Sequence, residues 1–278
     1  MLPYMQRHAE DTVSIPFDRT SFPEMYEKSL VRPLFRPWAE QMLEDAALER
    51  GERVLDVACG TGIVARLAKE RLGDGAKVVG VDVAPPMIEM ARSVAPEVDW
   101  RVGDAGALPL EAGEQFDHVL CQQGLQFFPD RAAAVREMRR ALAPGGRLAV
   151  STWRPDGEFP VLLELRRIAE RHLGPVADRR HAFGEPGPIE ALLREAGLRD
   201  VRTKNVSRTI RFEDGAVFVR LNAMALIGMS AAAAQIGEKE RERLLARIGE
   251  DSADVVRAHT DAGGFRYEIA ATIASATA

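Results

Sequence analysis

Two glycines and two aspartates stand where the chain could bind a ligand. Gly60 and Gly62 follow a short apolar run, and a helical pattern begins directly after them. Glycine permits a tight turn and lets a ligand lie against bare backbone, while a helix start offers free N–H groups to an anionic group. Asp56 stands four positions before Gly60, and Asp82 ends the next apolar run. This spacing predicts a ligand-binding loop between a strand and a helix.

The glycine loop alone is open to two interpretations. The run from Gly60 to Ala65 fits the dinucleotide fingerprint G-x-G-x-x-A, and Asp82 follows at the expected distance. Asp56 argues against NAD, because a carboxylate there suits a cationic ligand and would repel a pyrophosphate. The tyrosines, at 4, 26 and 267, have no lysine four positions later, so the sequence lacks the Tyr-x-x-x-Lys pair of short-chain dehydrogenases. An NAD(P)-dependent oxidoreductase is therefore the less favoured alternative.

Alternating strands and helices must position these residues. Short apolar runs predict strands at 53–58, 77–83, 100–102, 116–121 and 147–152, and helical spacing predicts helices at 63–71, 86–93 and 132–142. This alternation is typical of βαβ units around a parallel sheet. Further on, we expect helices at 159–173, 189–196, 216–234 and 238–259 and strands at 201–212 and 264–273. Between 24 and 49, Pro33 and Pro37 divide a helical pattern into two or three short helices.

The composition limits the class of partner. The 278 residues, 46% hydrophobic and 28% charged, suffice for one α/β domain with a modest extra lobe. Lys and Arg total 37 against 42 Asp and Glu, a formal net charge of -5. Such a balance provides no long-range attraction for nucleic acid or for an anionic membrane, so we expect a small-molecule substrate.

The cysteines and the apolar runs indicate the compartment. Cys59 and Cys121 each lie inside an apolar run, which predicts small buried side chains rather than nucleophiles or a disulfide. The chain has neither a signal-peptide pattern nor an apolar stretch of ~18 residues, so we expect no membrane span and a cytoplasmic location. No metal-ligand spacing is evident, so no metal is expected.

Four segments, in order, resemble one enzyme family. They are VLDVACGTG at 54–62, the run 78–92, the run 102–130 and LAPGGRLAVSTW at 142–153. Together they resemble class I S-adenosylmethionine-dependent methyltransferases, most closely the ubiquinone/menaquinone-biosynthesis type of small-molecule methyltransferases. Four ordered matches are much more specific than one glycine loop.

The resemblance implies the fold and its domains. It predicts a doubly wound, mostly parallel seven-stranded sheet of the Rossmann-like methyltransferase type, with the last strand antiparallel beside the fifth. The strands at 201–212 and 264–273 would take the sixth and seventh places. We expect a helical arm or lid at 1–50 and a methyltransferase domain at 51–278, with lid insertions near 156–188 and 213–262.

The resemblance also implies which residues bind the cofactor, S-adenosyl-L-methionine. Asp56 would lie near the methionine ammonium, with the backbone of Ala58 and Gly60–Gly62 beneath the amino-acid part, and Asp82 would accept from both ribose hydroxyls. The other expected cofactor-binding residues are Val83 and Met87 around the adenine, Asp104 and the Ala105 N–H at its polar edge, Gln122 on the methionine side and Tyr26 closing over the cofactor.

Several of these residues have alternative roles. Asp56 and Asp104 could each cap the next turn or helix, and Met87 could be helix core. Gln123 and Phe127 are candidates for contact with the acceptor, and Phe127 could equally be core. His172 and His181 are candidates for a general base, whereas His118 is interpreted as a packing residue.

The resulting hypothesis is methyl transfer to a small-molecule acceptor, with oxygen or carbon favoured, driven mainly by proximity and alignment. The Asn-Pro-Pro-Tyr type of motif found in base-modifying methyltransferases is absent, since the fourth strand ends in Cys121-Gln122-Gln123-Gly124. A non-methylating S-adenosylmethionine-binding protein of the same fold is the main alternative. The sequence is compatible with a homodimer and does not identify the acceptor.

Overall fold

The computed structural model describes residues 22–278, so residues 1–21 of the predicted 1–50 arm lie outside the described residues. The chain divides into two compact units. The sheet unit consists of Leu30–Pro155, Arg180–Ser207 and Ala270–Ala278. The helical unit consists of 22–29 with Asp156–Arg179 and Arg208–Ile269.

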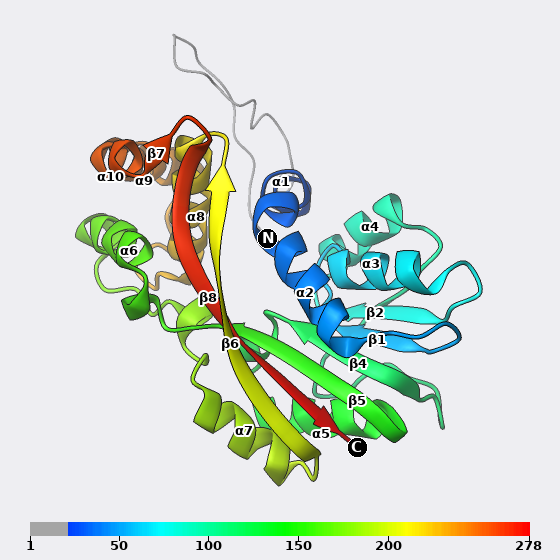
Figure 1. Ribbon diagram of the computed structural model, residues 1–278. Helices are drawn as coiled ribbons and strands as arrows, with labels where there is room; N and C mark the ends of the chain where they lie inside the picture. The colour runs from blue at the N-terminus through cyan, green and yellow to red at the C-terminus, as the bar shows by residue number, and fades with distance from the viewer. Residues whose placement is uncertain (1–21) are drawn as a thin grey trace. The chain divides into compact units, whose positions relative to one another are not determined.

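One mixed sheet contains all strands of the described residues. They are β1 (Val54–Val57), β2 (Val78–Asp82), β3 (Asp99–Val102), β4 (Phe116–Gln122), β5 (Leu142–Trp153), β6 (Arg199–Phe212), β7 (Thr260–Asp261) and β8 (Gly264–Thr277). Their order is β3-β2-β1-β4-β5-β8-β6, and β7 pairs with β8 (Figure 1). Strands β1 to β5 are parallel and β8 is antiparallel beside β5, which confirms the predicted sheet. The two-residue β7 is too short to leave a sequence pattern.

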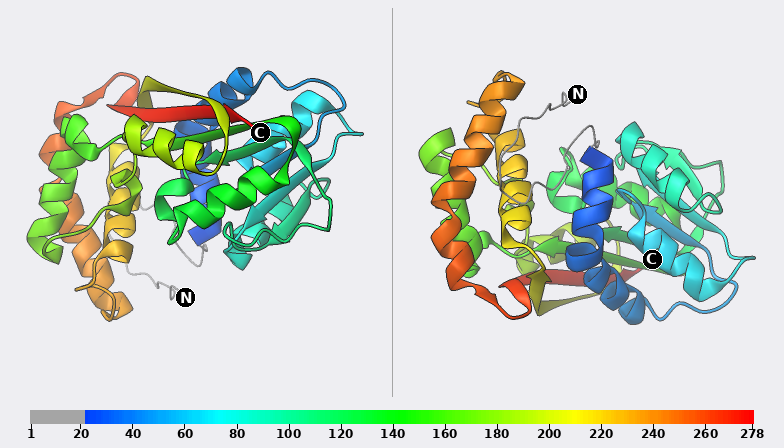
Figure 2. Two further views of the ribbon diagram at one scale, coloured as in Figure 1. Left: turned by 90° about the horizontal axis from the view of Figure 1, so that it is seen from below. Right: turned by 90° about the horizontal axis from the view of Figure 1, so that it is seen from above.

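Helices cover both faces of the sheet within the sheet unit. α2 (Arg36–Ala46), α3 (Ile63–Leu72) and α4 (Pro85–Val94) lie on one face, and α5 (Arg131–Ala141) and α7 (Pro186–Glu195) lie on the other (Figure 1). In Figure 2, α5 and α7 lie towards the viewer in the left view, seen from below, and α2 and α3 lie towards the viewer in the right view, seen from above. The doubly wound α/β class is thus confirmed.

The core explains why the central strands read as continuous apolar runs. β1 lies between β2 and β4, and all four of its residues are buried. Parallel strands with helices on both faces have no solvent-facing side. On the α5 face, Val119 and Cys121 pack in one cluster with Val135 and Met138. Burial raises the pKa of the Cys121 thiol to about 12, so this residue is a neutral core side chain.

β5 begins earlier than the predicted 147–152. Phe116 of β4 pairs with Leu142, but two residues later His118 pairs with Arg147, so the register shifts across the intervening segment. Gly145 has a φ of 78° in this segment. The pairing of Leu142 with Phe116 depends on β4, and the sequence between 142 and 147 shows no alternation of apolar and polar residues that would predict a strand there.

The helices before β1 follow one another directly in the chain. α1 (Phe22–Tyr26) is followed by the π-helix η1 (Glu27–Phe35) and then by α2. Pro33 lies inside η1, and Pro37 lies in the first turn of α2. The predicted division at the prolines is therefore a change of helix type without an intervening loop.

The helical unit contains α6 (Pro160–Leu173), α8 (Gly215–Met229), α9 (Glu238–Asp251) and α10 (Ala253–Ala258), with a short 3-10 turn at Asp156–Glu158. The predicted helix 216–234 ends early, at Met229, and the predicted helix 238–259 divides at Ser252. Its aromatic cluster includes Phe218, whose ring centroid lies 4.8 Å from that of Phe212 and 4.6 Å from that of Tyr267. The lid role of 156–188 and 213–262 remains a prediction.

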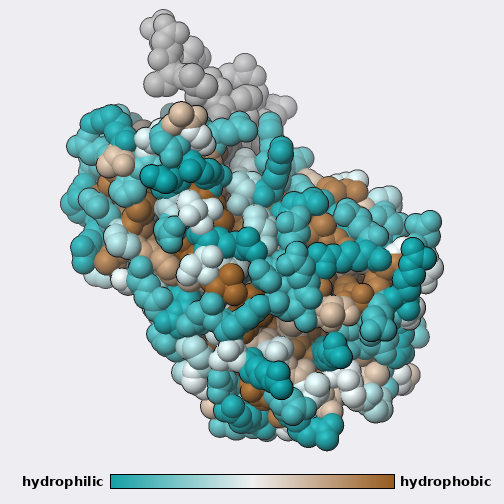
Figure 3. Space-filling view, viewed as in Figure 1, coloured by the Kyte–Doolittle hydropathy of each residue, from teal (hydrophilic) through white to brown (hydrophobic). Residues whose placement is uncertain are grey.

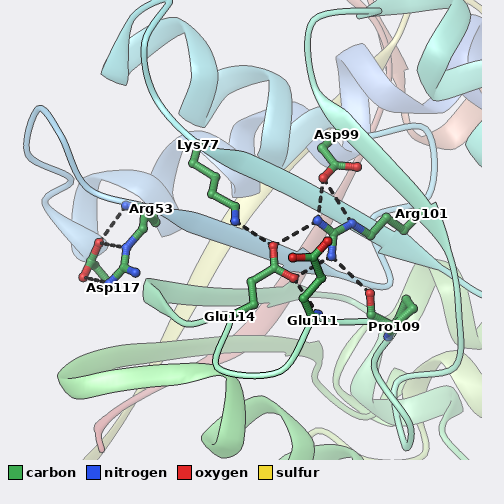
Figure 4. A network of polar contacts seen from close by, with 8 residues as sticks. All are labelled: Arg53, Lys77, Asp99, Arg101, Pro109, Glu111, Glu114 and Asp117. Carbon is green, nitrogen blue, oxygen red and sulfur yellow. Dashed lines mark hydrogen bonds and ion pairs between the residues drawn. The ribbon is translucent and has the colours of Figure 1, made fainter.

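An ionic network joins the amino ends of the parallel strands (Figure 4). The Glu114 carboxylate, which precedes β4, forms two ion pairs. Lys77 Nζ lies 2.7 Å from its Oε1, and Arg101 Nη1 lies 2.7 Å from its Oε2. Arg53 and Asp117 form a second pair, with Nη2 2.9 Å from Oδ1. These contacts hold the strand starts together, at the edge opposite the residues singled out as ligand-binding.

Figure 3 shows that the visible face is mostly hydrophilic, with small hydrophobic patches.

Candidate functional site

Most of the predicted site residues lie at or just beyond the carboxyl ends of β1 to β4. Parallel neighbouring strands end at the same edge of a sheet, and open α/β sheets bind ligands there. The residues at this edge are Asp56, Ala58, Gly60, Gly62, Asp82, Val83, Met87, Asp104, Ala105, Gln122, Gln123 and Phe127. All of them belong to the sheet unit.

The loop after β1 has a left-handed backbone at three positions. Ala58, Gly60 and Gly62 have φ angles of 57°, 56° and 89°. Such angles are rare for a residue with a side chain, so Ala58 adopts an uncommon conformation. The Cys59 N–H donates to Val81 O over 3.0 Å, and the Gly62 N–H donates to Cys59 O over 2.8 Å. The loop is therefore a compact turn held against β2, and α3 begins at its end.

Asp82 joins the end of β2 to this loop. Its Oδ2 accepts from the Gly60 N–H over 2.8 Å and its Oδ1 from the Ala84 N–H over 2.9 Å. Burial raises the pKa of Asp82, and backbone hydrogen bonds from Ala84, Gly60 and Val83 oppose that shift. Each carboxylate oxygen has a further lone pair, so Asp82 can still accept hydroxyl donors while it holds the loop.

Asp56 lies deeper, and only 1% of it is exposed. Its Oδ2 accepts from the Ala65 N–H over 3.1 Å, which caps the first turn of α3. Its Oδ1 is buried and has no hydrogen-bond partner among the described residues. Burial raises the pKa of Asp56 to about 8, and the nearby charge of Asp82 adds to the shift. A buried carboxyl with one unpaired oxygen is suited to a cationic group, which would favour its charged form.

Apolar side chains are exposed beside Asp82. Val83 is 66% exposed and Val102 is 44% exposed, and Met87 on α4 is half-buried. Val102, which pairs with Asp82 in the sheet, was not among the predicted residues. Asp104 follows β3, and its Oδ1 accepts from the Gly106 N–H over 2.6 Å, which closes a turn. Val83, Val102 and Met87 together offer an apolar surface to a flat ring.

The carboxyl end of β4 holds buried amides. Gln122 Nε2 donates to Phe35 O over 3.1 Å, while Gln122 Oε1 and Ser151 Oγ are buried and lack a partner within residues 22–278. Ser151 pairs with Gln122 in the sheet. Gln123 has a φ of 55° and accepts at Oε1 from Gln126 Nε2 over 3.3 Å. Phe127 follows and is 43% exposed.

Sequence reasoning missed Trp100, whose indole ring packs beneath the glycine loop. A Cβ added at Gly62 would lie 2.1 Å from Trp100 Cη2, and one added at Gly80 would lie 2.3 Å from Trp100 Cζ3. The indole ring therefore packs directly against both glycines. An isolated glycine inside a strand pattern, such as Gly80, indicates this kind of close approach and could have been noticed.

The remaining candidates lie elsewhere in the chain. Tyr26 and His172 belong to the helical unit, where His172 Nε2 lies 3.0 Å from Asp251 Oδ2. His181 belongs to the sheet unit, and its Nδ1 lies 2.7 Å from Arg154 O. His118 lies at the amino end of β4, with Nε2 3.0 Å from Glu52 Oε2. Within the described part of the chain, no three His, Cys, Asp or Glu side chains form a group that could hold a metal ion.

Comparison with known proteins points to one family. A family model described as a methyltransferase domain matches residues 55–150. The demethylmenaquinone methyltransferase of Thermus thermophilus is 47% identical over 173 residues, which cover 55% of this chain and 78% of that protein. Relatives from Mycobacterium tuberculosis are 31% identical over 186 residues, and this chain spans 66% of their length.

Solved structures share the fold. The YcgJ protein of Bacillus subtilis matches with a TM-score of 0.56 and 20% identity, over 86% of this chain and 97% of that one. The [4+2]-cyclase SpnF matches with a TM-score of 0.52 and 22% identity, over 87% of this chain and 80% of that one. No helix within residues 22–278 is both long enough and apolar enough to cross a membrane.

Proposed function

Since the chain belongs to the family of S-adenosylmethionine-dependent methyltransferases, we propose that it binds this cofactor at the carboxyl edge of β1 to β4 and methylates a small molecule. The observation that carries the proposal is the position of the Asp82 carboxylate, which accepts a hydrogen bond from the Gly60 N–H in the glycine loop. A carboxylate at this place can accept both hydroxyls of a ribose.

The residues at this edge fit the parts of the cofactor. Oδ1 of buried Asp56, which has no hydrogen-bond partner among residues 22–278, suits the ammonium of the methionine part. The backbone of Ala58, Gly60 and Gly62 would lie beneath that part. The exposed Val83 and the half-buried Met87 offer apolar contact to the adenine. Asp104 and the Ala105 N–H would bind its polar edge, and Gln122 would face the methionine side.

The sulfonium of the cofactor supplies an electrophilic methyl group when it is bound. The chain itself then has to hold the acceptor in line and exclude water, which can account for much of the rate enhancement. Gln123 and Phe127 are proposed to contact the acceptor. The demethylmenaquinone methyltransferase and the nocamycin O-methyltransferase among the relatives support a small-molecule acceptor. We favour oxygen or carbon as the acceptor atom. His172 and His181 are candidates for a general base, and we assign that role to neither of them.

Calorimetric titration tests the proposal. The purified protein is titrated with S-adenosylmethionine, S-adenosylhomocysteine and NADH, beside the variants Asp82→Ala and Asp99→Ala. We expect micromolar binding of both sulfur nucleotides, lost in Asp82→Ala and kept in Asp99→Ala, whose carboxylate pairs with Arg101 at the start of β3. Binding of NADH alone would refute the methyltransferase assignment.

A turnover assay then separates methyl transfer from the non-methylating alternative. The protein is incubated with S-adenosylmethionine and a panel of phenolic and quinol acceptors, and S-adenosylhomocysteine is quantified. Formation of this product in step with a methylated acceptor supports transfer. Tight cofactor binding with a converted but unmethylated substrate would instead favour the alternative. The cytoplasmic location and the homodimer remain predictions.

A further inference from the structure

We propose that Trp100 is a positioning residue, which supports the glycine loop from beneath and holds it in the shape that binds the cofactor. The inference rests on the proposed function for its link to the cofactor. Its structural part, the support of the loop, stands on the contacts of Trp100 alone.

The sheet register places the indole ring under the loop. Asp56 of β1 pairs with Gly80 of β2, and Gly80 pairs with Trp100 of β3. Paired residues on neighbouring strands project from the same face of a sheet, so these three residues form one row. Because Gly80 has no side chain, the space above it is open to the ring of Trp100.

The six-membered ring fills that space and reaches the loop. A Cβ at Gly80 would lie 2.3 Å from Trp100 Cζ3 and 2.4 Å from Cε3, and a Cβ at Gly62 would lie 2.1 Å from Cη2. All three distances are far below van der Waals contact, so the ring lies against the Cα atoms of the two glycines. Trp100 is only 5% exposed. A leucine side chain at this position would end short of the loop, because its methyl groups lie three bonds from Cα whereas Cη2 of the indole lies six bonds away.

The other side of the indole is anchored. Its Nε1–H donates to Ala95 O over 2.7 Å, just after α4, and the Arg92 side chain donates to Trp100 O over 2.7 Å. The ring is therefore held between the end of α4 and the glycine loop. A rigid support of this kind is worth most under a loop that contains left-handed residues, and Gly62 has a φ of 89°.

This support reaches both ends of the proposed cofactor site. Gly62 precedes α3, whose first turn is capped by Asp56 in the same row as Trp100. Trp100 itself lies two residues before Val102, which pairs with Asp82. A shorter side chain at 100 leaves a cavity below Gly62, so the loop relaxes and the backbone that faces the methionine part moves.

The test compares Trp100→Leu and Gly80→Ala with the double variant Gly80→Ala/Trp100→Leu. Phe116→Leu is the matched control, because Phe116 is a fully buried ring at the amino end of β4, opposite the site. Binding of S-adenosylhomocysteine is measured by calorimetry. Hydrogen exchange of the backbone amides at 58–64 is measured without any ligand, and unfolding in urea gives the stability of each variant.

We expect Trp100→Leu to weaken binding about tenfold and to raise exchange of the loop amides at least tenfold. Phe116→Leu should lower stability to a similar extent and should change neither S-adenosylhomocysteine binding nor exchange of the loop amides. Gly80→Ala should weaken binding more than the double variant does, because the leucine leaves room for the added methyl group. Equal effects of Trp100→Leu and Phe116→Leu on binding and exchange would overturn the inference. If the wild type binds no sulfur nucleotide, the proposed function fails, while the exchange of the loop amides still decides whether Trp100 supports the loop.

Discussion

The Gly60 N–H donates to Asp82 Oδ2 over 2.8 Å, so the loop after β1 is tied to the carboxylate that ends β2. The other oxygen holds the Ala84 N–H. In Asp82→Asn only one oxygen remains, and the new amide donor faces an N–H group. We expect cofactor affinity to fall about tenfold or more, the effect of one charge-assisted hydrogen bond. Calorimetry on this variant and on the exposed Asp99→Asn checks the prediction, which equal affinities would contradict.

The buried carboxyl of Asp56 predicts a dependence of stability on pH. Its pKa is raised from 3.8 to about 8 in the folded protein, so between these values the folded state keeps a proton that the unfolded state has lost. Stability must therefore fall as pH rises through this window, by at most ~1.4 kcal/mol per pH unit. The raised pKa of Asp82 acts in the same direction.

Asp56→Asn should flatten this profile. The amide keeps an acceptor for the Ala65 N–H and does not titrate. Urea unfolding of the ligand-free protein at pH 5, 6, 7 and 8 gives the slope for each protein. Parallel slopes for wild type and variant would show that Asp56 is not the titrating group.

The exposed valine beside Asp82 separates binding from folding. Val83 is 66% exposed, so Val83→Ser should change the free energy of unfolding by less than about 0.5 kcal/mol. Loss of its apolar contact with adenine should weaken S-adenosylhomocysteine binding several-fold. Val94→Ser, on the exposed side of α4, is the matched control and should bind normally. A normal dissociation constant for Val83→Ser would exclude Val83 from the adenine contact.

Gln122 carries a buried acceptor that has no hydrogen-bond partner within residues 22–278, and such a group is costly in a folded protein. Gln122→Leu removes that cost and also the hydrogen bond to Phe35 O, so we expect a net change in unfolding free energy below about 1 kcal/mol. Cofactor binding should nevertheless weaken about tenfold. The two measurements together decide whether the amide serves the ligand, because a purely structural amide would lower stability and leave binding unchanged.

The network at the opposite edge predicts acid sensitivity without loss of binding. Arg101 and then Lys77 lower the pKa of Glu114 from 4.5 to about 2. Its contribution to stability is therefore present above pH ~5 and lost as pH falls towards 2. Glu114→Gln should cost about 2 kcal/mol at pH 7 and much less near pH 2, where about half of the Glu114 carboxyls are protonated, with unchanged cofactor affinity. The exposed neighbour Glu111→Gln serves as control, and a constant difference across pH would refute the assignment.

Much of the fold could be predicted because the signals are local. The strands around the glycine loop are apolar runs bounded by turn residues, and the helices between them keep a period of 3.6 residues. Gly60, Gly62 and Asp82 could be singled out for the same reason, since their spacing along the chain reflects one strand, one turn and one helix. The register shift in β5 and the two-residue β7 could not be predicted, because both depend on pairing with a distant strand.

The sequence by itself determined the order of the elements, the loop and the edge at which the candidate residues gather. Only the tertiary structure decided which side chains are exposed there and what each one contacts. Asp56 proved to be a buried cap of α3 whose Oδ1 has no partner in the described part of the chain, and the Trp100 ring proved to pack beneath the loop. The physical reason is register: the alignment of β1, β2 and β3 puts Asp56, Gly80 and Trp100 in one row, and no pattern along a single strand contains that alignment.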